Sequence, residues 1–168
     1  MVLTKSELIA SLQNEVRILL HLAGKIDRAT LDYRPSPKQR STIELLRYLS
    51  VMGPMLVQVA KTKVDMDAVA AARKAAEARD FDQTLAVIAG QADTYAALLG
   101  DMSDADLRAE MDGFDGKKVS RGAFIINLAL CGCAAYRTQL FMYLKACGRD
   151  ELATMNLWYG ADAPPAAA

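Results

Sequence analysis

The amino-acid sequence predicts an all-α protein: a bundle of four long helices with an extra short surface helix and an extended C-terminal tail. Three observations predict this. Apolar residues recur at alternating spacings of three and four in four long segments of the 168-residue chain, as bundle helices require. Two of these segments begin with a capping box. Nothing convincing alternates with a period of two, so no β-sheet is expected.

The first two helices are predicted from their capping boxes. Thr4 and Glu7 begin the first helix, and Ser41 and Glu44 begin the second. In each box the two side chains can satisfy free backbone N–H groups at the helix start. Pro54 interrupts the second helix, and we expect a kink there because proline lacks a backbone donor and crowds the preceding turn.

The middle of the chain predicts a surface helix and then a third bundle helix. Residues 65–79 are alanine-rich and highly charged, so this helix has little to bury. Asp80 caps the third bundle helix, which ends near Gly100. Residues 101–119 then form a connection, with a tight turn favoured at Gly116.

The last helix, from about residue 121 to 147, is apolar nearly all round between residues 123 and 136. It is therefore central in the bundle, or covered on its second face by another chain or by the tail. We expect residues 1–148 to form the bundle and residues 149–168 to form a docking tail. Its aromatic side chains, Trp158 among them, are expected to dock because exposure forfeits roughly 2 kcal/mol or more each.

Composition limits the partners and the location. Twenty basic and twenty acidic residues cancel, so nothing favours nucleic acid as a partner. No secretory signal is visible, and the longest nearly apolar stretch, residues 122–136, is too short to span a bilayer. Three clustered cysteines fit reduced thiols better than a disulfide framework. We therefore expect a cytoplasmic protein with no membrane or nucleic-acid partner.

Two motifs resemble those of the DinB-like superfamily. The runs LDYRP at residues 31–35 and RSTIELL at 40–46 are similar to the first connection and second-helix start of that family. The run YRTQL at 136–140 resembles its last long helix. The resemblance covers roughly residues 5–148. It implies a four-helix bundle, commonly a homodimer, with a divalent metal held by three histidines, and several members transfer low-molecular-weight thiols.

On this resemblance, all three metal-binding positions are substituted. The histidine of the second helix falls on Tyr48, and the histidine pair of the last helix falls on Gly132 and Tyr136. A phenol is protonated at neutral pH and binds zinc or nickel poorly, and glycine has no side chain. The sequence therefore predicts a bundle without the family metal.

Other side chains do not complete a metal site. His21, the single histidine, is expected on the exposed side of the first helix, away from its apolar stripe. Cys131 and Cys133 lie about 200° apart around a helix, so their thiols point to opposite faces, and we expect buried structural thiols. We therefore expect no metal and no other cofactor.

The former metal position has two interpretations. Five residues lie around it or on the same helix face: Tyr48, Gly132, Tyr136, Gln139 and Tyr143. Hydroxyls, an amide and the open spot beside the glycine describe a small-molecule pocket among apolar walls. Alternatively, the tyrosines fill the old metal cavity and bond to the glutamine as an inert polar core.

Three functions are consistent with these observations. The first is a metal-free module that binds a small molecule with the residues above. The second is a homodimeric interaction module, because the last helix is apolar on two sides and the tail is aromatic. The third, implied by the resemblance, is a metal-dependent thiol S-transferase or related hydrolase. No catalytic acid–base pair is visible, and Arg137 is expected to form a surface or interface ion pair rather than bind an anion.

Overall fold

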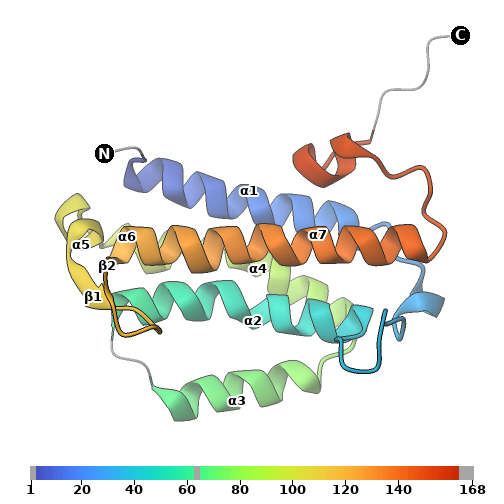
Figure 1. Ribbon diagram of the computed structural model, residues 1–168, viewed down its shortest axis with the longest axis horizontal. Helices are drawn as coiled ribbons and strands as arrows, with labels where there is room; N and C mark the ends of the chain where they lie inside the picture. Colours follow the sequence, from blue (N-terminus) through green and yellow to red (C-terminus); the bar gives the residue numbers. More distant parts are fainter. Residues whose placement is uncertain (1–2, 63–64, 163–168) are drawn as a thin grey trace, which may run out of the picture.

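A computed structural model describes residues 3–62 and 65–162. Four long helices form the bundle (Figure 1): α1 (Lys5–Ala23), α2 (Thr42–Lys61), α4 (Phe81–Gly100) and a continuous C-terminal helix made of α6 (Arg121–Phe124), η2 (Ile125–Leu130) and α7 (Cys131–Ala146). Helices α1 and α2 each contact both α4 and the C-terminal helix, so the apolar core lies between all four. This confirms the predicted all-α bundle.

Both predicted capping boxes are present. The backbone N–H of Thr4 donates to Glu7 over 2.7 Å, and that of Ser41 donates to Glu44 over 2.8 Å. These bonds satisfy donors that have no partner inside the helix. Helix α2 continues through Pro54 without interruption.

Helix α3 (Met66–Glu77) is the predicted surface helix. It lies outside the four-helix bundle, alongside α2 (Figure 1). Only Ala76 of this helix is buried. The alanine-rich, charged sequence therefore predicted its exposure, although not its neighbours.

The connection before the C-terminal helix contains two strands, where the sequence indicated none. After α5 (Asp104–Arg108), strands β1 (Glu110–Asp112) and β2 (Lys118–Ser120) pair antiparallel. Gly116 has φ of +76° in the turn between them, as the predicted tight turn requires. Each strand has three residues, which is too short for a period-two pattern to be recognised.

The C-terminal helix differs from the uninterrupted α-helix that its sequence predicted. Residues of η2 form a π-helical turn, in which backbone bonds reach one residue further than in an α-helix. The outward side of the helix carries exposed Cys131, Ala135 and Met142. No element of the described chain covers this side. The C-terminal helix is therefore apolar on two sides, as the sequence indicated.

Two helices are long and apolar enough to cross a membrane by length and composition, Thr42–Lys61 and Arg121–Ala146. The second, 26 residues long, exceeds the apolar stretch that was judged too short from the sequence. Core helices of water-soluble bundles meet the same test, and 50% of the apolar window of Thr42–Lys61 and 28% of that of Arg121–Ala146 are buried inside the described part of the chain. The architecture is that of a soluble helical domain.

The tail folds back onto the bundle. Its π-helical turn η3 (Met155–Tyr159) contacts α1 and α7, on the side of the bundle away from α3 (Figure 1). The sequence indicated that the aromatic side chains of the tail would make this contact, but other side chains make it. Trp158 and Tyr159 stay 66% and 61% exposed, whereas Leu152 and Asn156 are buried. Residues 163–168, the Pro/Ala-rich end, lie outside the described residues.

Candidate functional site

The structure brings together two of the five predicted site residues at the position where the family resemblance implies a metal. Tyr48 on α2 and Tyr136 on α7 meet edge to face, with ring centroids 5.1 Å apart. Burial, and then hydrogen bonding with Tyr136, raise the pKa of the Tyr48 hydroxyl above its usual value. The Arg40 guanidinium lies 4.0 Å from the centroid of the Tyr48 ring. Tyr48 is therefore a neutral donor beside a cation at neutral pH.

Gly132 does not leave the open spot that the sequence suggested. A Cβ at this position would lie 3.4 Å from Sδ and 3.6 Å from Cε of Met52, which reaches across from α2. Methionine fills irregular gaps in helical cores because it is long and flexible. This part of the predicted pocket is therefore filled by a side chain of the protein itself.

The other two predicted residues form a second pair. The Gln139 amide nitrogen donates to the Tyr143 hydroxyl, which in turn donates to the Arg40 carbonyl oxygen over 2.9 Å. The Tyr143 ring packs edge to face on Tyr33 at 5.5 Å and is only 3% exposed. These contacts attach α7 to the connection that precedes α2. Arg40 links the two pairs, since its backbone holds Tyr143 and its side chain covers Tyr48.

A cavity of about 620 Å³ lies beside Tyr48, between α2 and α3. We call it the basic cavity. Its lining residues are Arg40, Glu44, Arg47, Tyr48, Val51, Arg73, Ala76 and Glu77.

Some charged side chains of the basic cavity have partners within the protein, and others do not. Arg34 binds Glu44 over 3.0 Å, and Arg47 donates to the Arg79 carbonyl oxygen over 2.8 Å. Within the part of the chain that the structure describes, the side chains of Arg40, Arg73 and Glu77 form no ion pair or hydrogen bond, so two cations and one carboxylate of the lining are unpaired. Two guanidinium groups beside a neutral tyrosine hydroxyl are thus available to an anion.

A second cavity, of about 590 Å³, lies between α2, α3 and α4. We call it the apolar cavity. Helix α2 contributes Pro54, Met55 and Val59, and α4 contributes Val87 and Leu98. Both cavities are lined by Val51 and Arg73, so they adjoin along α2 and α3.

The described residues do not fit the three-histidine metal site that the resemblance implies. Tyr48 and Tyr136 face each other where two ligands would stand, and Met52 occupies the space beside Gly132. No group of three or more His, Cys, Asp or Glu side chains that could hold a metal ion occurs in residues 3–62 and 65–162. A phenol pair without a thiolate or imidazole is a poor site for zinc or nickel.

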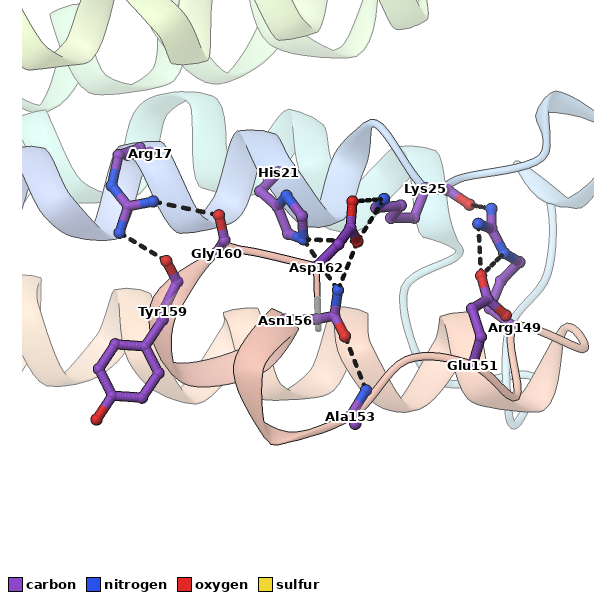
Figure 2. Close-up of polar contacts among 10 residues, drawn as sticks. All are labelled: Arg17, His21, Lys25, Arg149, Glu151, Ala153, Asn156, Tyr159, Gly160 and Asp162. Atoms are coloured by element: carbon purple, nitrogen blue, oxygen red, sulfur yellow. Dashed lines mark hydrogen bonds and ion pairs between the residues drawn. The ribbon is translucent and has the colours of Figure 1, made fainter. Parts of the chain in front are cut away.

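His21 is not the plain exposed residue that the helical pattern predicted. Its Nε2 lies 3.1 Å from the amide nitrogen of Asn156, in the tail that covers this side of α1 (Figure 2). Lys25 binds Asp162 over 2.7 Å in the same cluster, and Arg17 donates to the Tyr159 carbonyl oxygen over 2.8 Å. The prediction failed because the sequence pattern of α1 could not show which segment covers its second face.

Arg137 forms an ion pair, but inside the bundle rather than at a surface or interface. Its Nε and Nη2 bind the Glu15 carboxylate over 2.8 and 3.2 Å, joining α7 to α1. The Arg137 side chain is 11% exposed and that of Glu15 is 13% exposed. Burial raises the pKa of Glu15, and the neighbouring guanidinium opposes the shift.

The two neighbouring cysteines point to opposite faces, as their spacing predicted. Cys133 lies inside the bundle beside Tyr95, and burial raises the pKa of its thiol to about 11. Cys131 is exposed, which corrects the expectation that both thiols are buried. The difference follows from the uncovered outer side of the C-terminal helix.

Sequence reasoning missed the arginines of the basic cavity. Glu44, Arg47 and Val51 are spaced by three and four residues along one face of α2, and Arg40 lies just before the Ser41 cap of that helix, which is a signal that the sequence contains. Arg73 had no such signal, because only the position of α3 beside α2 brings it to the cavity.

The fold places the chain in a known class: it has a DinB-like helical-bundle fold. The solved structure that shows this is a DinB-like protein, YjoA, from Bacillus subtilis. The two share 19% sequence identity with a TM-score of 0.65, and the match covers 87% of this chain and 95% of that one. No family model matches the chain, and no curated protein matches it.

Proposed function

We propose that the protein is a metal-free binding module for a small anionic molecule, held in the basic cavity. The observation that carries this proposal is the pair of guanidinium groups, Arg40 and Arg73, that have no carboxylate partner within the described residues. A cavity of about 620 Å³ is within the range of small-molecule sites. The neutral Tyr48 side chain lines the same space.

This proposal retains Tyr48, one of the five residues of the predicted site, as a ligand contact. It gives the other four residues different roles. Tyr136 supports the Tyr48 ring, and Tyr143 holds the backbone of Arg40. Gln139 positions the Tyr143 hydroxyl, and Gly132 makes room for Met52. These four residues support the side chains that contact the ligand, which are Arg40, Arg73 and Tyr48.

Titration calorimetry of the full chain with acetate, phosphate and citrate, at constant ionic strength, tests the proposal. Arg73→Gln should weaken binding about tenfold, because a hydrogen bond to a charged group contributes about 1.5 kcal/mol. Lys74→Gln is the matched control, since it removes a charge from the next residue of α3, which does not line the cavity. Tyr48→Phe should also weaken binding. If none of the three anions binds, or the two charge variants lose affinity equally, the proposal is wrong.

A homodimeric interaction module is the second candidate. The observation that favours it is the uncovered outer side of the C-terminal helix, which exposes Cys131, Ala135 and Met142. Apolar patches of this kind mark protein–protein contacts when they are contiguous. Sedimentation equilibrium at micromolar concentration tests it, and a dimer that Ala135→Glu dissociates would support this face as the contact.

Catalysis by a metal-dependent thiol transferase or hydrolase is the weakest candidate, because the described residues offer no ligand set for the metal. Zinc or nickel bound stoichiometrically to untagged protein would revive it. We also propose a cytoplasmic location, on the grounds of the cysteine usage and the charged surface.

A further inference from the structure

Most of the polar side chains that line the apolar cavity already form hydrogen bonds within the protein. The Gln91 amide donates to the Leu49 carbonyl oxygen over 2.9 Å, and the Thr94 hydroxyl donates to that of Gly90 over 3.0 Å. The Gln58 amide donates to the Thr62 hydroxyl over 2.7 Å. A ligand in this cavity therefore finds few free hydrogen-bonding side chains and mainly apolar contact surface.

The other two polar lining residues are also engaged. Asp65 caps α3 by accepting from the backbone N–H groups of Asp67 and Ala68. The Ser50 hydroxyl donates to the Arg47 carbonyl oxygen over 2.7 Å and accepts from the Arg79 guanidinium over 3.0 Å. Asp65 thus binds the start of α3 through Oδ1, and the Ser50 hydroxyl binds the α2 backbone and Arg79.

Arg73 is the exception among the lining residues of the apolar cavity. It forms no ion pair or hydrogen bond within the described residues, and it stands where the two cavities adjoin. An apolar space thus ends at an unpaired cation, next to a cavity that holds a second one, Arg40. Charge complementarity selects a ligand with an anionic end and an apolar body.

The apolar side of α2 sets the size of that body. Val51, Pro54, Met55 and Val59 extend along about 12 Å of the helix at 1.5 Å per residue. An extended alkyl chain of about ten carbons covers this length, because tetrahedral C–C bonds of about 1.5 Å advance roughly 1.2 Å each along the chain.

We propose that the two cavities together bind a single-chain amphipathic anion. Its carboxylate or phosphate head lies between Arg40, Arg73 and Tyr48, and its alkyl chain lies along α2 and α4 beneath α3. This inference rests on the proposed function and deepens it, from an anion to an alkyl-chain anion.

Calorimetry of the full chain with acetate, hexanoate, octanoate and decanoate tests the inference, with each ligand kept below its micelle concentration. The Kd should tighten by about fourfold for each added methylene, until the chain fills the apolar cavity. Decanol, which has the chain without the charge, should bind about tenfold more weakly than decanoate. Decyl phosphate should bind like decanoate, because both heads suit a guanidinium pair.

Two matched variants separate the chain site from the head site. Ala72 lines the apolar cavity, so Ala72→Trp should abolish the dependence on chain length while acetate binding stays the same. Ala71 is exposed and does not line either cavity, so Ala71→Trp should leave the whole series unchanged. Both substitutions are on the exposed helix α3, which keeps the bundle core intact.

The outcomes distinguish this inference from the proposed function. Equal affinity for acetate and decanoate, with both sensitive to Arg73→Gln, would overturn the inference and leave the proposed function standing. Decanoate and decanol binding equally, both insensitive to Arg73→Gln, would overturn both. A dimer that Ala72→Trp dissociates would assign the apolar cavity to a second copy, and binding to anionic vesicles alone would assign it to a membrane. Either result overturns the inference.

Discussion

The amide of Asn156 fixes the protonation state of His21. Its oxygen accepts the Ala153 backbone N–H over 2.9 Å, so its nitrogen must face the imidazole Nε2 and the Asp162 carboxylate (Figure 2). Because both hydrogens of that nitrogen are then donated, the 3.1 Å contact requires Nε2 to be an acceptor. The ring is therefore neutral, with its proton on Nδ1, when the tail is docked.

His21 should titrate below its ordinary pKa of 6.5, because burial first and the positive charge of Lys25 second lower it. Asp162 acts in the opposite direction, and Arg17 adds to the lowering. NMR of the single imidazole measures this directly. Lys25→Gln should raise the pKa toward 6.5, and a wild-type value above 6.5 would contradict the docked geometry.

Tail docking should consequently weaken in acid. A histidine whose pKa is lowered on docking binds protons more readily in the undocked state, so docking is unaffected above about pH 6.5 and weakens as the pH falls through that value. Hydrogen exchange of the backbone amides in η3 measures docking. The protection factors of the η3 amides, which correct for the slower intrinsic exchange in acid, should fall between about pH 7.5 and pH 5.5, more than those of the α2 core do. His21→Gln should remove that difference.

Gly53→Ala should destabilise the protein by about 2 kcal/mol, because added bulk in a packed core forces side chains or backbone to shift. The Cβ would overlap the Tyr95 hydroxyl and lie 3.2 Å from its Cζ, in a ring that is fully buried. Chemical denaturation of Gly53→Ala, of Tyr95→Phe and of the double variant measures this.

Tyr95→Phe should rescue part of that loss, because it removes the overlapping oxygen. Within the described residues the hydroxyl has no hydrogen bond of ordinary geometry, so its removal alone should cost little. Gly132→Ala is the control, since the Met52 thioether it meets at 3.4 Å is flexible. Equal losses at both glycines would contradict the close approach at Gly53.

Arg137→Met should cost about 3 kcal/mol or more, because it leaves the Glu15 carboxylate buried without its partner. The double variant with Glu15→Leu should recover most of that loss, since a buried ion pair often contributes little over an apolar pair. Denaturant titration of the full cycle checks this. Arg28→Met is the control, because its pair with Asp82 is exposed and contributes little.

Cys131 should react with thiol reagents well before Cys133. The exposed thiol is accessible, whereas the pKa of about 11 leaves about one in a thousand Cys133 thiols ionised near pH 8. Mass spectrometry after timed labelling identifies the order. Labelling of Cys131 that slows as protein concentration rises would also locate the dimer contact proposed for this face, and concentration-independent labelling would count against it.

Helix existence, caps and exposure could be predicted because they depend on neighbours within one turn or two. Each capping box joins two residues only three apart, Thr4 with Glu7 and Ser41 with Glu44. The low apolar content of α3 indicates a surface position by itself. The π-helical turn of η2 and the three-residue strands have no such local signature.

The site was predicted in part for the same reason. Tyr48 and Tyr136 were placed together from equivalent positions in a related fold, and the structure shows their rings in contact. Met52 beside Gly132 could not be foreseen, because it depends on how two helices face each other. The partner of His21 lies 135 residues away in the chain, beyond the reach of any helical period.

The tail also determines what intrinsic fluorescence measures in this protein. Trp158 is the only tryptophan, and it stands 66% exposed on η3 rather than in the core. Its emission therefore reports the contact of the tail with α1 and α7 rather than the packing of the bundle core. A melting curve recorded through that emission would give the stability of a surface contact, whereas circular dichroism would give that of the four helices.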